Sequence, residues 1–172
     1  THLNVLDMDV YLRLAPELYL KRLVVGGFHK VYDICTNFRN EGMDFMHNPE
    51  FTMIEWYEAY TDYNGVMDTA EELYKYIAKS LNGSYSLEFQ KRKINLNGKW
   101  PRVPMTEIIK KELKIDVEKM SEKELLKYVE DNNMEYRGRS VKGILINAIF
   151  EKKVTEKLDG PIWIIDYPKE VS

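Results

Sequence analysis

Residues 35–60 read "CTNFRNEGMDFMHNPEFTMIEWYEAY", and the two segments on either side of the polar centre of this stretch decide the fold. The first segment is the end of residues 30–38, "KVYDICTNF", whose side chains fall into two alternating sets, as in a β-strand. The second segment, residues 51–60, is rich in aromatic and β-forming residues. A polar loop at residues 40–50 joins the two segments, which predicts an antiparallel hairpin.

Helical patterns lie on both sides of this hairpin. Residues 17–25, "ELYLKRLVV", place most of their leucines on one side and are closed by Gly26 and Gly27, as a helix C-terminus should be. Residues 61–83 carry apolar residues at steps of three and four and stop at an Asn-Gly pair. Both segments are therefore predicted to be helices.

The remaining elements are predicted from shorter signals. Ser121 and Glu124 stand in capping-box register and predict the start of a helix. Further elements are expected as a short strand at residues 10–14, a hairpin-like excursion at 86–97, a helix at 140–158 and a buried strand at 161–166.

These elements do not alternate regularly as strand, helix and strand, and the clearest strand pairing is a hairpin. The order predicts the α+β class, an antiparallel sheet flanked by helices, rather than a doubly wound parallel sheet. Neither GxGxxG nor GxxxxGK[ST] occurs in the sequence, so a nucleotide would not bind on a glycine-rich cradle.

Composition excludes several classes of function. The 172 residues suffice for one compact unit, and their net charge of -3 gives no basic footprint for non-specific nucleic-acid binding. No apolar run approaches the roughly 18 residues of a membrane span and no signal peptide is visible, so we expect a cytoplasmic protein without a membrane partner. The single cysteine, Cys35, excludes an internal disulfide and a cysteine-cluster zinc site.

The hairpin carries a set of polar residues with a period of two. Arg39 and Glu41 share one strand face, and Phe51, Glu55 and Tyr57 share a face of the next strand. If the two faces coincide, the patch offers an anion-binding guanidinium, a cation-binding carboxylate and a flat ring for a planar base. A simple Arg-Glu ion pair between two strands explains the spacing equally well, so the spacing alone leaves both interpretations open.

The sequence "YLRLAPELYLKRLVVGGFHKVYDICTNFRNEG", followed by "HNPEFTMIEWYEAYTDYNGVMD", resembles the catalytic domain of class II lysyl-tRNA synthetases. "FRNEG" is similar to the second signature motif of that class, and "WIIDYPKEVS" resembles the strand ahead of its final active-site segments. The resemblance is close over residues 3–69 and 162–172, with the motif 2 region at 28–60, and looser over 82–140. It implies that residues 1–172 are part of a single catalytic domain of this type, without the anticodon-binding domain.

The resemblance implies that lysine is activated by ATP to lysyl-adenylate and then transferred to tRNA(Lys). On this basis Arg39 would be the catalytic residue that grips the lysine carboxylate and the α-phosphate. Glu41 would face the adenine amino group, Phe51 would lie under the adenine, and His47 and Asn48 would approach the phosphates. A homodimer is expected for the full-length protein, and Mg²⁺ is expected as its metal, with ligands outside this chain.

The lysine-binding residues implied by the resemblance are Glu17, Arg39, Glu55 and Tyr57. Glu17 would receive the α-amino group, while Glu55 and Tyr57 would hold the ε-ammonium. Without the resemblance, Glu17 is equally explained as an acidic residue favoured at a helix N-terminus. His47 would then be a hydrogen-bonding loop residue.

Several departures from the family pattern are visible. Residue 1 is a threonine and the chain stops just after an apolar strand, so both ends look like cuts through a larger domain. The first and last signature motifs are missing, and Met46 and Thr36 stand where arginines are more usual. We therefore expect little or no aminoacylation from this chain alone.

Two alternative functions remain open. One is a lysyl-transferase that acts on elongation factor P. The sequence of this transferase contains a run similar to residues 47–57. "APELYLKRLVVGG" and "EAYTDY" favour the tRNA enzyme over it. The other is a non-catalytic synthetase-like binding module, against which the intact set of Arg39, Glu41, Glu55 and Tyr57 argues.

Overall fold

The structure is a computed structural model that describes residues 1–40, 42–43, 47–89, 91–136 and 138–171. Its contacts divide the chain into two compact units, residues 1–66 and 67–172, and the division falls in the first turn of the long helix α2, Tyr63–Asn82. That the chain is part of a single catalytic domain stays a prediction.

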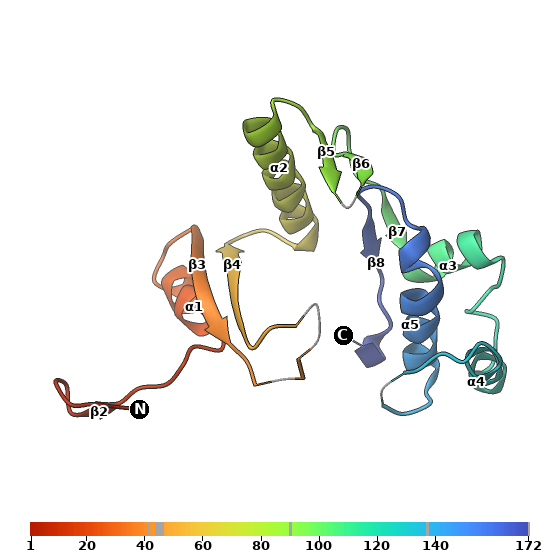
Figure 1. The fold of residues 1–172 in the computed structure, drawn as a ribbon, viewed down its shortest axis with the longest axis horizontal. Helices are drawn as coiled ribbons and strands as arrows, with labels where there is room; N and C mark the ends of the chain where they lie inside the picture. The colour runs from red at the N-terminus through yellow and green to blue at the C-terminus, as the bar shows by residue number, and fades with distance from the viewer. Residues whose placement is uncertain (41, 44–46, 90, 137, 172) are drawn as a thin grey trace. The chain divides into compact units, whose positions relative to one another are not determined.

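The first unit is built around the predicted hairpin. Strand β3, Lys30–Phe38, pairs antiparallel with β4, Glu50–Glu58, over nine residues on each side (Figure 1). Helix α1, Glu17–Val25, contacts both strands, and a short antiparallel pair, β1 at His2–Leu3 and β2 at Met8–Asp9, precedes it.

Helix α1 ends where the glycines predicted it to end. The N–H of Gly27 donates to Val24 O at 3.0 Å, and the N–H of Phe28 donates to Leu23 O at 3.1 Å. Gly27 has a φ of 103°, a backbone conformation that side-chain-bearing residues avoid. The chain therefore leaves the helix directly into β3.

The strand predicted at residues 10–14 is wrong. Pairing in this region is confined to β1 and β2, and residues 10–14 are extended without a partner strand. The backbone of the segment is held by single bonds to separate residues, among them Phe38 N–H to Arg13 O at 2.7 Å and Arg39 Nε to Leu14 O at 3.3 Å. Pattern alone cannot make a strand where no continuous ladder of hydrogen bonds is available.

The second unit places helices around an apolar core. Its described elements after α2 are β5, Ser86–Phe89, β6, Arg92–Asn95, β7, Arg102–Pro104, α3, Met105–Leu113, α4, Glu122–Asp131, α5, Lys142–Lys153, η1, Thr155–Lys157, β8, Trp163–Ile165, and η2, Lys169–Val171. The hairpin expected at residues 86–97 is confirmed as the β5–β6 pair. The helix expected at 140–158 is shorter, since α5 ends at Lys153 and the 3₁₀ turn η1 follows it.

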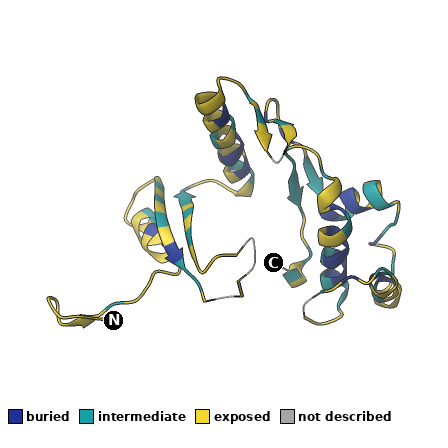
Figure 2. Cartoon of the chain, in the orientation of Figure 1, coloured by how far each residue is buried: buried dark blue, intermediate teal, exposed yellow. Residues whose placement is uncertain are grey.

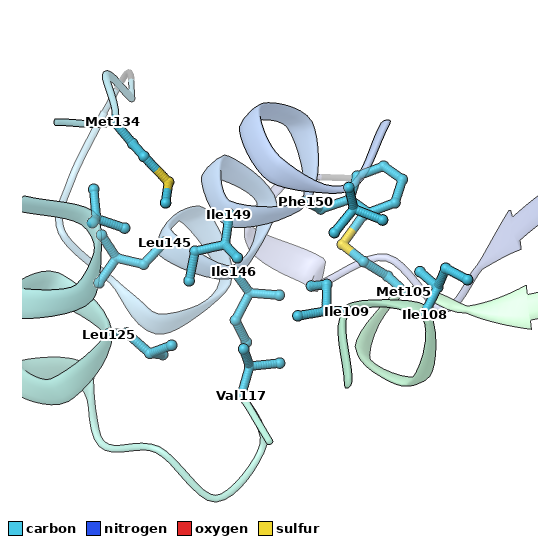
Figure 3. Close-up of a cluster of buried hydrophobic side chains, with 12 residues drawn as sticks. Met105, Ile108, Ile109, Val117, Leu125, Met134, Leu145, Ile146, Ile149 and Phe150 are labelled. Atoms are coloured by element: carbon cyan, nitrogen blue, oxygen red, sulfur yellow. The ribbon is translucent and has the colours of Figure 1, made fainter. Parts of the chain in front are cut away.

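The core of this unit lies between α3, α4 and α5. Ile109, Leu125, Leu145 and Ile149 are completely buried and converge from the three helices (Figure 3). Figure 2 shows the buried residues running along α5, whereas most residues of α4 are exposed. Helix α4 begins with the predicted capping box, in which Ser121 N–H donates to Glu124 Oε2 at 2.8 Å.

The strands in the described residues form four separate pairs rather than one sheet. Three pairs are antiparallel, which together with the helices is compatible with the α+β class, and the fourth, β7 with β8, is parallel. Parallel strands need a long crossover connection, and α3, α4 and α5 supply it here. The sequence analysis predicted neither β7, whose three residues give a weak periodic signal, nor α3, which is as long as the predicted helix α1.

Candidate functional site

The β3–β4 hairpin has one covered face and one exposed face. In the pairing register Asp33 lies opposite Glu55, and Asn37 lies opposite Phe51. These residues are buried or half-buried, whereas Tyr32 on the other face is 70% exposed (Figure 2). The predicted polar residues of β4 therefore lie on the covered face.

Arg39 and Phe51 lie together at one end of this face. The guanidinium carbon of Arg39 is 5.3 Å from the centre of the Phe51 ring, which is a cation–π contact. Arg39 Nε donates to Leu14 O at 3.3 Å, and the Arg39 backbone N–H donates to Pro49 O at 2.9 Å. These bonds hold a planar cation beside a flat ring, as an anionic group attached to a planar base would require.

Glu55 and Tyr57 lie together further along the same face. The Tyr57 hydroxyl donates to Glu55 Oε1 at 2.6 Å, because the two residues are two positions apart on one strand and their side chains share a face. Burial raises the pKa of the Tyr57 hydroxyl, and so do the hydrogen bond to Glu55 and the negative charges of Glu55 and Glu17. Tyr57 therefore keeps its proton at neutral pH and donates it to the hydrogen bond with Glu55.

Glu17 reaches this group from the first turn of α1. Its carboxylate accepts a hydrogen bond from Lys21, one turn along the helix. Lys21 Nζ in turn lies 5.6 Å from the centre of the Tyr57 ring. The cluster thus holds two carboxylates, a phenol and an ammonium group, in which the Lys21 ammonium is the partner of Glu17.

Asp33 and Arg13 belong to the same face, and sequence reasoning missed both. Arg13 Nη1 donates to Asp33 Oδ2 at 2.7 Å. The pKa of Arg13 is raised by a hydrogen bond and charge interaction with Cys35 and further by Asp33. The alternation of β3 could have pointed to Asp33, but no local pattern predicts that Arg13, twenty residues earlier, pairs with it.

The other predicted site residues, and the two positions that depart from the family pattern, lie as follows. His47 and Asn48 lie in the connection between the two strands and are exposed. Glu41 and Met46 lie outside the described residues. Thr36 pairs with Thr52 on the exposed face, opposite to the face of Arg39.

Within the described ranges, no group of three or more His, Cys, Asp or Glu side chains is arranged to hold a metal ion. No helix in that part of the chain is both long enough and apolar enough to cross a membrane.

The sequence model of the family "tRNA synthetases class II (D, K and N)" matches residues 1–172, and the chain belongs to this family. It is 48% identical over 175 residues to the lysine–tRNA ligase of Pelotomaculum thermopropionicum and 47% identical over 180 residues to that of Carboxydothermus hydrogenoformans. The ligase of Thermotoga maritima is 45% identical over 172 residues.

These matches cover the whole of this chain but 35%, 36% and 34% of the three relatives, respectively. The chain thus spans about a third of the length of the curated relatives that it matches. The resemblance to class II lysyl-tRNA synthetases is confirmed.

Proposed function

We propose that the full-length protein containing this chain is a lysine–tRNA ligase, which activates lysine with ATP and transfers it to tRNA(Lys). The observation that carries the proposal is the common face of the β3–β4 hairpin, which brings Arg39 and Phe51 together and, further along, Glu55 and Tyr57. The names of the relatives support the same reaction. The comparisons give no support to the elongation factor P lysyl-transferase or to a non-catalytic module.

In the first step, a carboxylate oxygen of lysine attacks the α-phosphorus of ATP. A mixed anhydride, lysyl-adenylate, forms as the bond to the leaving pyrophosphate breaks. Two anionic groups must approach each other, so catalysis depends on positioning and charge neutralisation. Arg39 supplies both, because its planar guanidinium can bind the carboxylate and the α-phosphate at once and is already held by Leu14 O.

Phe51 is proposed to form the platform for the adenine ring. Phe51 lies beside Arg39, so the adenine could stack on the ring while the phosphate of the same ligand binds the guanidinium. Glu41, His47 and Asn48 are proposed to contact the adenine amino group and the phosphates. Mg²⁺ would add charge neutralisation at the phosphates from ligands outside this chain, and the steps described here use only the residues of this chain.

Lysine selectivity is proposed to rest on the cluster around Glu55. The ε-ammonium would bind the Glu55 carboxylate beside the Tyr57 hydroxyl, which already donates to Glu55 and so orients it. The α-amino group would displace Lys21 from Glu17. An uncharged substrate would leave the carboxylate of Glu55 without its partner, which is costly in a covered site.

In the second step, a terminal hydroxyl of tRNA(Lys) attacks the carbonyl carbon of lysyl-adenylate, and AMP leaves. We propose that the full-length protein acts in the cytoplasm as a homodimer. The 172-residue chain alone is expected to show little or no aminoacylation.

The test is lysine-dependent exchange of pyrophosphate into ATP by the full-length protein, which needs no tRNA. Arg39→Ala is expected to abolish the exchange. Arg22→Ala, which removes an exposed arginine from α1, is the matched control and is expected to leave it unchanged. Unchanged exchange in Arg39→Ala would remove the catalytic assignment.

A further inference from the structure

The second unit contains a pocket that the proposed reaction does not use. Its volume is about 720 Å³, which falls within the range of small-ligand sites. Helix α2 contributes Tyr74, strand β6 contributes Arg92 and Lys93, and the segment before β8 closes it with Asp159 and Gly160. The pocket therefore combines an aromatic side, a basic side and one acidic residue.

The aromatic side is a row of three rings. The Tyr74 ring centre is 5.9 Å from that of Trp100, and the Trp100 ring centre is 5.7 Å from that of Trp163. Trp100 is 8% exposed and packs with Leu96 and Ala78, whereas Tyr74 is 57% exposed. The row is thus anchored at its middle ring, Trp100, and presents Tyr74 to a ligand.

The basic side is the β5–β6 hairpin. Lys91, Arg92 and Lys93 follow one another at its turn and are all exposed. The register pairs Arg92 with Phe89 and Lys93 with Glu88, so Lys93 has an acidic cross-strand neighbour, and both Arg92 and Lys93 line the pocket. Arg92 lies on the face that also carries Ile94, a lining residue of the pocket.

Asp159 is a weak ion-pair partner of Arg92. Arg92 Nη1 lies 3.9 Å from Asp159 Oδ1, and the two side chains are 67% and 92% exposed. An ion pair of this length and exposure adds little stability. A phosphate group can therefore take the place of Asp159 at Arg92.

From these features we infer that the pocket binds a single-stranded segment of RNA, with a base on Tyr74 and a phosphate on Arg92 and Lys93. An exposed ring beside adjacent cations is the arrangement by which proteins hold single strands without base-specific contacts. The inference rests on the proposed function, which supplies tRNA as the RNA that the protein meets.

The experiment measures binding of a tRNA(Lys) transcript to the full-length protein by fluorescence anisotropy over a series of salt concentrations. The double variant Arg92→Gln, Lys93→Gln is expected to bind about tenfold more weakly and to lower the slope of log K against log salt by about 1.5. The matched control is Lys123→Gln, Lys127→Gln, which removes two exposed charges from α4 and is expected to bind as the unaltered protein does.

Two further variants are expected to change RNA binding in different ways. Asp159→Asn removes the carboxylate that competes for Arg92, so it is expected to tighten RNA binding about twofold to threefold at low salt. Tyr74→Leu is expected to weaken binding about fivefold to tenfold without a change in the salt slope, because stacking involves no counterion release. Circular dichroism checks that each variant is folded.

Pyrophosphate exchange separates this inference from the proposed function. All pocket variants are expected to keep the exchange rate, since that reaction needs no RNA. Loss of exchange in Arg39→Ala together with unaltered tRNA binding and salt slope in the Arg92, Lys93 variant would overturn the pocket assignment alone. An equal loss of binding in the α4 control would overturn it as well.

Discussion

The Tyr57 hydroxyl donates a 2.6 Å hydrogen bond to Glu55 Oε1 on the covered face of the hairpin. The bond joins two side chains of one strand that point to the same side, and it fixes the carboxylate before any substrate arrives. Glu17 adds a second negative charge near the same phenol. The relationship defines a place for a cation on a face that otherwise packs against α1.

Glu55→Gln is the first prediction. It removes the charge that would bind the ε-ammonium, so the KM for lysine in pyrophosphate exchange is expected to rise about 100-fold while the KM for ATP changes little. Glu58→Gln on the same strand is the control, because Glu58 pairs with Lys30 across the hairpin instead. Equal changes in the two KM values would refute the assignment of Glu55.

Phe51→Leu is predicted to act on ATP. Leucine keeps the apolar character but removes the flat ring beside Arg39, so the KM for ATP is expected to rise about fivefold. The KM for lysine is expected to stay nearly constant. Tyr32→Leu removes an aromatic ring from the exposed face of the same hairpin and is expected to change neither constant.

The Arg13–Asp33 pair is predicted to position Glu55. Asp33 lies directly opposite Glu55, and Arg13 balances its charge at 2.7 Å. In Arg13→Gln the unbalanced Asp33 would compete with Glu55 for the lysine ammonium, and kcat/KM for lysine is expected to fall about tenfold. Adding Asp33→Asn is expected to restore most of the loss, and a double variant as impaired as Arg13→Gln would contradict this role.

Glu71→Gln is predicted to destabilise the second unit. Glu71 is 5% exposed and accepts hydrogen bonds from Lys75 Nζ at 2.6 Å and from the Trp100 N–H at 3.2 Å. Removing the Glu71 charge leaves Lys75 with only the exposed Glu72, 3.7 Å away, as an ionic partner, so the free energy of unfolding is expected to fall by about 3 kcal/mol. Glu72→Gln is the control, since the Glu72 side chain is 79% exposed, and thermal unfolding followed by tryptophan fluorescence measures both.

The same pair predicts a dependence of stability on pH. Burial raises the pKa of Glu71, but the hydrogen bonds from Lys75 and Trp100 and the charge of Lys75 outweigh it, so the pKa lies below its ordinary value of 4.5. The stabilisation is therefore complete above pH 4.5 and is lost as the pH falls through the lowered pKa. Glu71→Gln is expected to abolish this part of the acid dependence, and an unchanged acid limb would contradict the prediction.

The sequence predicted the elements whose signals are local. The hairpin, α1, α2 and the Ser121–Glu124 capping box depend on periodicity and on end residues within a few positions of each element. The common face of Phe51, Glu55 and Tyr57 followed from the period of two along one strand. The roles assigned to these residues stay predictions.

Other features could not be predicted, because they join residues that are distant in the sequence. Three helices lie in the sequence between the paired strands β7 and β8, and helix α1 lies in the sequence between Arg13 and its partner Asp33. No periodic pattern specifies which distant partner a residue will meet. The strand predicted at residues 10–14 was wrong for the same reason, since a strand forms only where a neighbouring strand supplies hydrogen bonds.

The sequence by itself determined where the chain turns, which positions share a strand face and which family it resembles, since side-chain period and contiguous motifs are properties of short segments. Only the tertiary structure decided that Arg39 lies beside Phe51, that Lys21 lies beside the Tyr57 ring, and that Arg92 lines one pocket with Tyr74, Trp100 and Trp163. These contacts depend on packing and charge between separate elements, which are set when the chain folds.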